Sequence, residues 1–92
     1  MLPRIVHVRH VRDYCLELRF SDGSIGQVDL RGDVVGRGGV FQPLEDATYF
    51  ARVKVDSDAG TIAWPNGVDL DPDVLHARTT GKALPHDQHA SA

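Results

Sequence analysis

Three aspartates at alternate positions, Asp69, Asp71 and Asp73, have the spacing with which carboxylates open a calcium-binding loop. The rest of an EF-hand loop is missing, because Val74 stands where glycine is needed and Thr80 where a bidentate glutamate is needed. Asp71 and Asp73 are also well placed to begin a short helix, which explains two of the three carboxylates without a ligand. The spacing therefore predicts no metal site.

The histidines form no convincing ligand set either. His7 and His10 fall on opposite faces of a predicted strand. His86 and His89 have a spacing that suits one metal ion, but no cysteine or further histidine stands nearby to complete a tetrahedral site. His76 would lie on a helix near two of the aspartates just described, so it remains a candidate binding residue.

A glycine-rich segment, Gly36 to Gly39, includes Arg37 and could hold a phosphate between backbone N–H groups and the guanidinium. The lysine of a Walker motif and the spacing of a dinucleotide fingerprint are both absent. Glycines in a connecting loop need only backbone freedom. A mobile loop is therefore favoured over an anion site.

Nucleophilic chemistry is weakly indicated. Cys15 faces away from the predicted core, and no histidine is fixed near it in the sequence. Trp64 is explained as a core residue. As an alternative it is a contact anchor, because a tryptophan at a hairpin end beside Pro65 and Asn66 can present its ring edge to a partner.

The elements that position these residues begin with three strands. The clearest alternates between apolar and polar side chains, and its apolar face consists of Tyr14, Leu16, Leu18 and Phe20. Arg4 to Val11 precedes it, with Val6 and Val8 expected on one face and Ile5 on the other. Ile25 to Arg31 follows it. The pattern predicts a three-stranded antiparallel meander.

The turn between the second and third strands sets their register. A two-residue loop would mix apolar and polar faces, whereas the three-residue loop Ser21-Asp22-Gly23 opposes Leu18 with Gly26. The longer loop is favoured, and it requires a positive φ at Gly23.

A second hairpin is predicted downstream. Arg52 to Asp56 alternates in polarity, and a turn leads into Thr61 to Trp64. At Pro65-Asn66-Gly67 a further three-residue loop opposes Trp64 with Val68. The turn chemistry agrees, because proline and asparagine suit the two central positions and glycine the left-handed residue that follows.

Two short helices are expected. Asp46 is a good N-cap for one, and Asp71 for another that runs from Pro72 to about Arg78. The apolar residues that they should bury are Leu44, Ala47, Phe50, Val74 and Leu75. Upstream, Gly32 to Gly39 is expected to lack regular structure, and a proline should keep Gln42 extended.

The predicted fold class is α+β, with a small antiparallel sheet of about five to six strands, a three-stranded meander plus a second hairpin, and two short helices. The chain has 92 residues, 41% of them hydrophobic, which suffices for one modest core. Residues 1–80 are expected to form the single domain. Residues 81–92 lack periodicity and an apolar face, so a flexible C-terminal tail is expected there.

Composition excludes several partners. The formal net charge of -3 disfavours direct binding to nucleic acid. No apolar run approaches the roughly 18 residues that span a bilayer, so no membrane association is expected. Cys15 is the only cysteine and cannot form an internal disulfide, which favours a reducing cytoplasm.

The stretch Ile62 to Leu75, with Trp-Pro-Asn-Gly inside it, is similar to sequences of the small bacterial domain-of-unknown-function family 2442. Leu18 to Gly23, Val28 to Leu30 and Phe41 to Leu44 strengthen the resemblance, which covers about residues 5 to 78. It implies a compact α+β domain and an association with toxin–antitoxin-like gene pairs, beside another small uncharacterised protein. It brings no catalytic residues. Some members continue into a helix-turn-helix domain, which is not expected in these 92 residues.

Two functional hypotheses follow. The first is a non-catalytic protein-interaction module, the antitoxin-like partner of a small toxin-like protein encoded by a neighbouring gene. The second is a small-molecule or anion-binding domain, or weak enzyme, with a cleft near Arg37, Asp29, Asp69 and His76. The candidate binding residues are Trp64, Asn66, Asp69, His76, Asp29 and Arg37. No catalytic residue, metal or cofactor is predicted.

Overall fold

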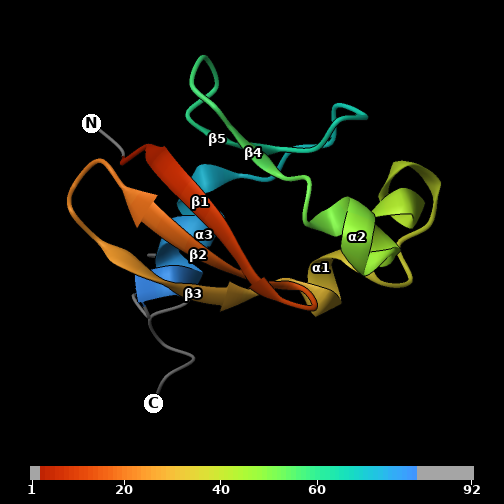
Figure 1. Ribbon diagram of the computed structural model, residues 1–92. Helices are drawn as coiled ribbons and strands as arrows, with labels where there is room; N and C mark the ends of the chain where they lie inside the picture. The colour runs from red at the N-terminus through yellow and green to blue at the C-terminus, as the bar shows by residue number, and fades with distance from the viewer. Residues whose placement is uncertain (1–2, 81–92) are drawn as a thin grey trace, which may run out of the picture.

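The computed structural model describes residues 3–80, in which the first three strands form an antiparallel meander (Figure 1). They are β1 (Ile5–Arg12), β2 (Cys15–Phe20) and β3 (Ile25–Asp29), in the spatial order β1-β2-β3. Leu18 lies opposite Gly26, and Gly23 has a φ of +90°, so the three-residue loop and its register are confirmed. This register gathers the apolar side chains of β2 and β3 on one face.

Irregular pairing in β1 changes which of its side chains face the core. The register with β2 shifts by one residue between Ile5 and His7. A β-bulge of this kind adds a residue to one strand and interrupts the alternation of side chains. Ile5 and Val8 therefore both pack against the core while Val6 is 52% exposed. The expectation that Val6 and Val8 share a face is wrong.

A second pair of strands, β4 (Lys54–Asp56) and β5 (Thr61–Ala63), forms the predicted hairpin. After β5, the N–H of Trp64 donates to the carbonyl of Val68 at 2.9 Å, and Gly67 has a φ of +89°. The three-residue loop at Pro65 to Gly67 is therefore confirmed, with its glycine in the left-handed conformation.

The two groups of strands form separate sheets. The meander is a three-stranded sheet and the hairpin a two-stranded one, so the α+β class is confirmed but the single sheet of five to six strands is not. The hairpin packs the side chains of Ile62 and Trp64 into the same core as Leu16 and Leu18. Its backbone meets the meander at β1, where the N–H of Ile5 donates to the carbonyl of Gly60 at 3.0 Å.

Helical segments connect the strands and cover the core. They are α1 (Arg31–Val34), the 3₁₀ helix η1 (Gly39–Glu45), α2 (Ala47–Phe50) and α3 (Pro72–Thr80). No helix within residues 3–80 is long and apolar enough to cross a membrane.

The glycine-rich segment differs from its prediction. The stretch from Gly32 to Gly39 begins inside α1, and Val34 is completely buried there. Gln42 lies inside η1 instead of being extended, although Pro43 follows it. Burial of Leu44 in the core stabilises this helical turn more than the weak local preference opposes it.

Aspartate side chains begin two of the helices, as predicted. Oδ1 of Asp46 accepts the backbone N–H of Thr48 at 2.9 Å, at the start of α2. Oδ1 of Asp71 accepts the N–H of Asp73 at 2.8 Å, just before α3. Each bond satisfies an N–H group that has no partner inside its own helix.

The burial of these two helices was predicted only in part. Phe50 and Leu75 are buried as expected, but Ala47 is exposed and Val74 is 38% exposed. Helices this short present a narrow stripe to the core, so apolar neighbours on either side of that stripe remain in contact with solvent.

The helix α3 lies against one side of the meander (Figure 1). The approach is close at Gly26, where an added Cβ would lie 2.9 Å from both the carbonyl oxygen and the Cγ2 atom of Thr79. Real Cβ atoms do not tolerate a backbone atom at that distance, because it lies well inside van der Waals contact. The absence of a side chain at Gly26 is therefore a condition for this packing.

Gly26→Ala should lower the free energy of unfolding by about 1–3 kcal/mol, because the added methyl group must displace the backbone of α3. Gly32→Ala is the matched control, since a Cβ at Gly32 meets nothing within 4 Å. Urea unfolding of the two variants checks the prediction. Equal midpoints would show that α3 does not pack on β3 in this way.

Candidate interaction surface

Two of the four side chains expected around a common cleft share a neighbour, and the other two contact different parts of the chain. The four are Arg37, Asp29, Asp69 and His76. The carboxylate of Asp29 accepts the backbone N–H of Arg31 at 2.9 Å. The guanidinium of Arg37 lies 4.6 Å from the ring centroid of Phe41. Asp29 and His76 are thus engaged by other parts of the chain, whereas Arg37 and Asp69 share a neighbour, because Phe41 lines a depression together with Asp69.

Asp69 and Asn66 are brought together. Both line a shallow depression of about 260 Å³ beside Phe41. The Nδ2 of Asn66 donates to the carbonyl of Val40 at 2.9 Å, and its Oδ1 accepts the N–H of Val68 at 3.3 Å. The amide of Asn66 therefore ties the last turn of the second hairpin to η1, which is a structural task.

His76 contacts a turn of the meander instead of the aspartates beside it in the sequence. Its Nε2 lies 2.9 Å from Oδ2 of Asp22. Because an ionised carboxylate can only accept, Nε2 carries the proton. The imidazole also meets the ring of Phe20 edge-on, with the centroids 4.7 Å apart. These contacts join α3 to the turn between β2 and β3.

Two carboxyl groups have lowered pKa values. The pKa of Asp22 falls to about 2, mainly because the backbone N–H of Ser24 donates to the carboxylate, with a smaller effect of His76. The hydrogen bond from the guanidinium of Arg9, at 3.3 Å, lowers the pKa of Glu17. Both shifts keep a carboxylate ionised, which suits a structural contact and not proton transfer near neutral pH.

An ion pair that sequence reasoning missed also holds α3. The guanidinium of Arg78 donates to the carboxylate of Asp33 and, at 2.6 Å, to the carbonyl of Asp29. These contacts link the helix to α1 and to the end of β3. Nothing in the spacing indicates this pair, because the two charged residues stand 45 positions apart and meet only through packing.

Trp64 is a core residue, which was the simpler of its two interpretations. Its side chain is 3% exposed, and its Nε1 donates to the carbonyl of Phe50 at 2.9 Å. The two aromatic rings also touch, with centroids 5.4 Å apart. The indole therefore satisfies a buried carbonyl and fills the core beneath the hairpin.

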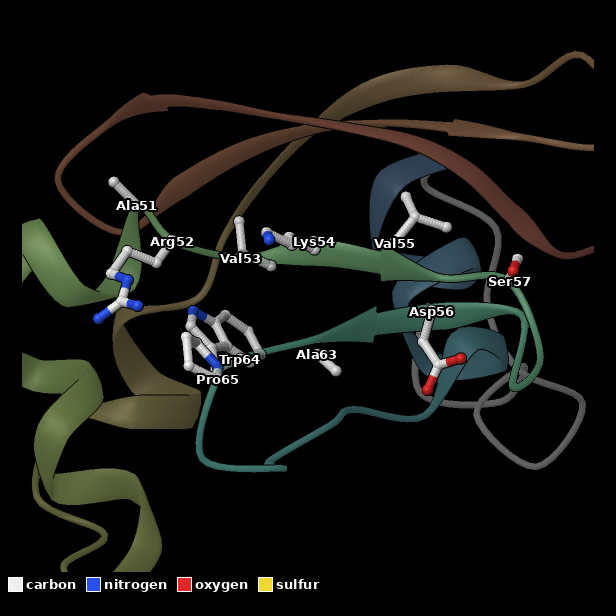
Figure 2. A pocket seen from close by; sticks show the side chains of 10 residues that line it. All are labelled: Ala51, Arg52, Val53, Lys54, Val55, Asp56, Ser57, Ala63, Trp64 and Pro65. Atoms are coloured by element: carbon white, nitrogen blue, oxygen red, sulfur yellow. The ribbon is translucent and has the colours of Figure 1, made fainter.

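An open depression of about 640 Å³ runs along the β4–β5 hairpin (Figure 2). It is lined by residues 51–57 and 63–65, so β4 borders it along its whole length. Val53 and Pro65 contribute apolar surface, while Arg52 and Lys54 contribute positive charge. Sequence reasoning did not single out this region. The polar residues at alternate positions of the predicted strand did indicate that one side of the strand faces solvent.

The edge of β4 that faces away from β5 is unpaired at Val55. Trp64 directs its N–H toward Val68, and successive residues of a strand direct their backbone groups to opposite sides, so Ala63 bonds toward β4. Lys54 is its partner there, and the next residue, Val55, therefore directs both backbone groups outward. Within residues 3–80, no hydrogen bond satisfies them.

Of the charged side chains beside this edge, the cations lack an acidic partner, whereas the carboxylate accepts hydrogen bonds. The ammonium group of Lys54 forms no ion pair or hydrogen bond with the part of the chain that the structure describes. The guanidinium of Arg52 lies 5.6 Å from the ring centroid of Tyr49 and has no carboxylate partner in residues 3–80. The carboxylate of Asp56 accepts two N–H groups of its own turn, at 3.1 and 3.2 Å. The hairpin surface therefore carries positive charge that no carboxylate of residues 3–80 neutralises.

Metal binding finds no support in the described part of the chain. Residues 3–80 contain no group of three or more His, Cys, Asp or Glu side chains that could hold a metal ion. The three alternate aspartates are thus not such a group. His86 and His89, and with them the expected tail at residues 81–92, lie outside the described residues.

Trp64→Phe should lower the free energy of unfolding by about 1–3 kcal/mol, because the buried carbonyl of Phe50 then keeps only the longer bond from the N–H of Val53, at 3.3 Å, and the smaller ring leaves a gap in the core. Tyr49→Phe is the control, since its hydroxyl makes no hydrogen bond with residues 3–80. Chemical denaturation measures both changes. A Trp64→Phe protein as stable as the control would show that the indole N–H does not stabilise the fold.

Asp22→Asn should destabilise the protein at pH 7, and the difference from the unmodified protein should shrink as the pH falls from about 4 to about 2. The sign follows from linkage: a carboxyl whose pKa drops from 3.8 to about 2 on folding stabilises the fold when ionised. That stabilisation is lost as the pH falls through the lower value. Urea midpoints measured across this range test it.

Asp58→Asn is the control for this pH dependence, because the Asp58 carboxylate makes no hydrogen bond within the described residues. It should follow the unmodified protein at every pH. A midpoint difference for Asp22→Asn that stayed constant down to pH 2 would contradict the assignment.

Comparison with known proteins places the chain in a family. No curated protein and no solved structure matches it significantly. A family model described as a protein of unknown function, DUF2442, matches residues 5–81. The match extends from β1 to the end of α3 and so includes both sheets and the depression along the hairpin. The chain therefore belongs to the DUF2442 family of proteins of unknown function, as its hairpin motifs predicted.

Proposed function

We propose that this chain is a non-catalytic protein-interaction module that binds another small protein through the β4–β5 hairpin. The observation that carries the proposal is the open depression of about 640 Å³ along the hairpin, where Val53 and Pro65 contribute apolar surface beside the cations of Arg52 and Lys54. Apolar surface with charged side chains around it is typical of a site that takes a protein partner.

The other candidate side chains support the proposal because each already makes contacts that hold the fold together. Asn66 holds a turn to η1, His76 holds α3 to the meander, and Trp64 fills the core. Groups engaged in this way contribute rigidity, not reaction chemistry. A rigid scaffold that presents an open depression suits a binding module.

We infer that the partner is a small toxin-like protein encoded beside this chain in a bacterial genome, and that this chain acts as its antitoxin-like partner in the cytoplasm. Membership of the DUF2442 family supports the inference, because the resemblance implies an association with such gene pairs. The net charge of -3 favours contact with a protein over direct contact with nucleic acid.

Affinity purification of the full chain with a mass-spectrometric readout, together with co-expression of the neighbouring gene product, tests the proposal. A stoichiometric protein partner is expected. Ala63→Arg should reduce its recovery about tenfold, because a long side chain then fills the depression. Gln27→Arg, on an exposed position of β3, adds the same side chain elsewhere and should change nothing. Failure to recover any partner would refute the function.

A further inference from the structure

Resting on this proposed function, we propose that the partner inserts an arginine side chain into a second depression of the surface, between Phe41 and Asp69. This Phe41 depression has a volume of about 260 Å³. Its lining consists of Val40, Phe41, Asn66, Gly67, Val68 and Asp69. Its place beside the hairpin, its size, its apolar walls and the charge of Asp69 each support the proposal.

One turn separates the Phe41 depression from the depression along the hairpin. Pro65 lines the hairpin depression, and the next two residues of the same turn, Asn66 and Gly67, line the Phe41 depression. All three residues are exposed. A partner that covers the hairpin depression therefore reaches the Phe41 depression by crossing a single turn.

The size of the Phe41 depression suits one side chain. Pockets for small-molecule ligands have volumes of roughly 300 to 1,000 Å³. The volume of about 260 Å³ lies below that range. The amide of Asn66 holds this hollow in shape, because it donates to the carbonyl of Val40 and accepts the N–H of Val68. A preformed hollow needs little rearrangement to accept a side chain.

The walls of the Phe41 depression are apolar, and Asp69 adds a negative charge. Val40 is 62% exposed, the largest exposed fraction among the large apolar side chains of residues 3–80, and Phe41 is half-buried. The carboxylate of Asp69 forms no hydrogen bond or ion pair with residues 3–80. Arginine matches both features, because its stem packs on apolar surface and its guanidinium stacks on aromatic rings and pairs with carboxylates.

The nearest arginine of the chain itself leaves Asp69 unpaired. The guanidinium of Arg37 lies 4.6 Å from the ring centroid of Phe41 and donates to the carbonyl of Asp33 at 3.3 Å. Arg37 is not among the residues that line the depression. Within the described part of the chain, Asp69 therefore provides the only charge of the lining.

A second copy of this chain fits the site less well than another protein does. Its cations without an acidic partner, Arg52 and Lys54, lie at the hairpin depression, across the turn from Asp69. A two-fold dimer that brought Lys54 of each copy to Asp69 of the other would place the two exposed turns against each other. The turns would then hold the depressions apart.

A matched pair of small probes tests the site on the full chain. N-acetyl-arginine methylamide at millimolar concentration should shift the amide NMR signals of Gly67 and Asp69. N-acetyl-citrulline methylamide has nearly the same shape without the charge and should leave both signals unchanged. Equal shifts from the two probes, or none from either, would overturn the inference. Shifts that grow with protein concentration alone would also overturn it, because a second copy would then be the occupant.

Variants test the site in the complex. Asp69→Asn should weaken binding of the co-purified partner about fivefold, as measured by calorimetry. Asp69→Glu keeps the charge and should bind the partner more tightly than Asp69→Asn. Asp13→Asn makes the same change in charge on the exposed turn between β1 and β2 and should have no effect. Val40→Ser should weaken binding of the partner and of the arginine probe, whereas Ile25→Ser, at an exposed position of β3, should weaken neither.

The outcomes separate this inference from the proposed function. A partner whose binding is weakened by Ala63→Arg, but not by Asp69→Asn or Val40→Ser, would overturn the arginine site and leave the interaction module intact. Failure of the unmodified chain to recover any partner would overturn the proposed function and, with it, this inference.

Discussion

The apolar face of the three-stranded meander cannot be covered by the meander itself, and the rest of the chain is arranged to cover it. A small sheet becomes stable only when such a face is buried. Leu16 and Leu18 share one core with Ile62 and Leu75, which come from the hairpin and from α3. The helices are too short to form alone, so their own stability also depends on this packing. Gly26 permits it, because a side chain there would collide with α3.

The same constraint explains why a binding surface remains. The hairpin uses one of its faces to cover the meander, and its strands therefore stay in a separate two-stranded sheet. β5 is paired on both sides, by β4 and by the bridge from Ala63 to Asp69, whereas β4 is paired with β5 alone and approaches β1 without pairing to it. Covering the core thus leaves an open depression along the hairpin, beside the charges of Arg52 and Lys54.

The acidity of the chain reflects local folding tasks more than it identifies a partner. Several aspartate carboxylates each accept the backbone N–H of the residue two positions later: Asp22, Asp29, Asp46, Asp56 and Asp71. Such contacts stabilise turns and helix starts. Although the net charge is -3, the charges of the hairpin surface that lack a partner of opposite sign are therefore positive.

Local sequence was sufficient for the strands, the registers of both three-residue loops and the two aspartate caps, because turn glycines, alternation and capping act within a few residues. It misplaced Val6, the start of the Gly32–Gly39 segment and the division into two sheets, since bulges and burial override local preference. The candidate site was less predictable: Asp69 and Asn66 do meet, but His76 meets Asp22 and Arg78 meets Asp33. Which side chains meet, and where the surface is left hollow, depends on the packing of segments that lie far apart along the chain.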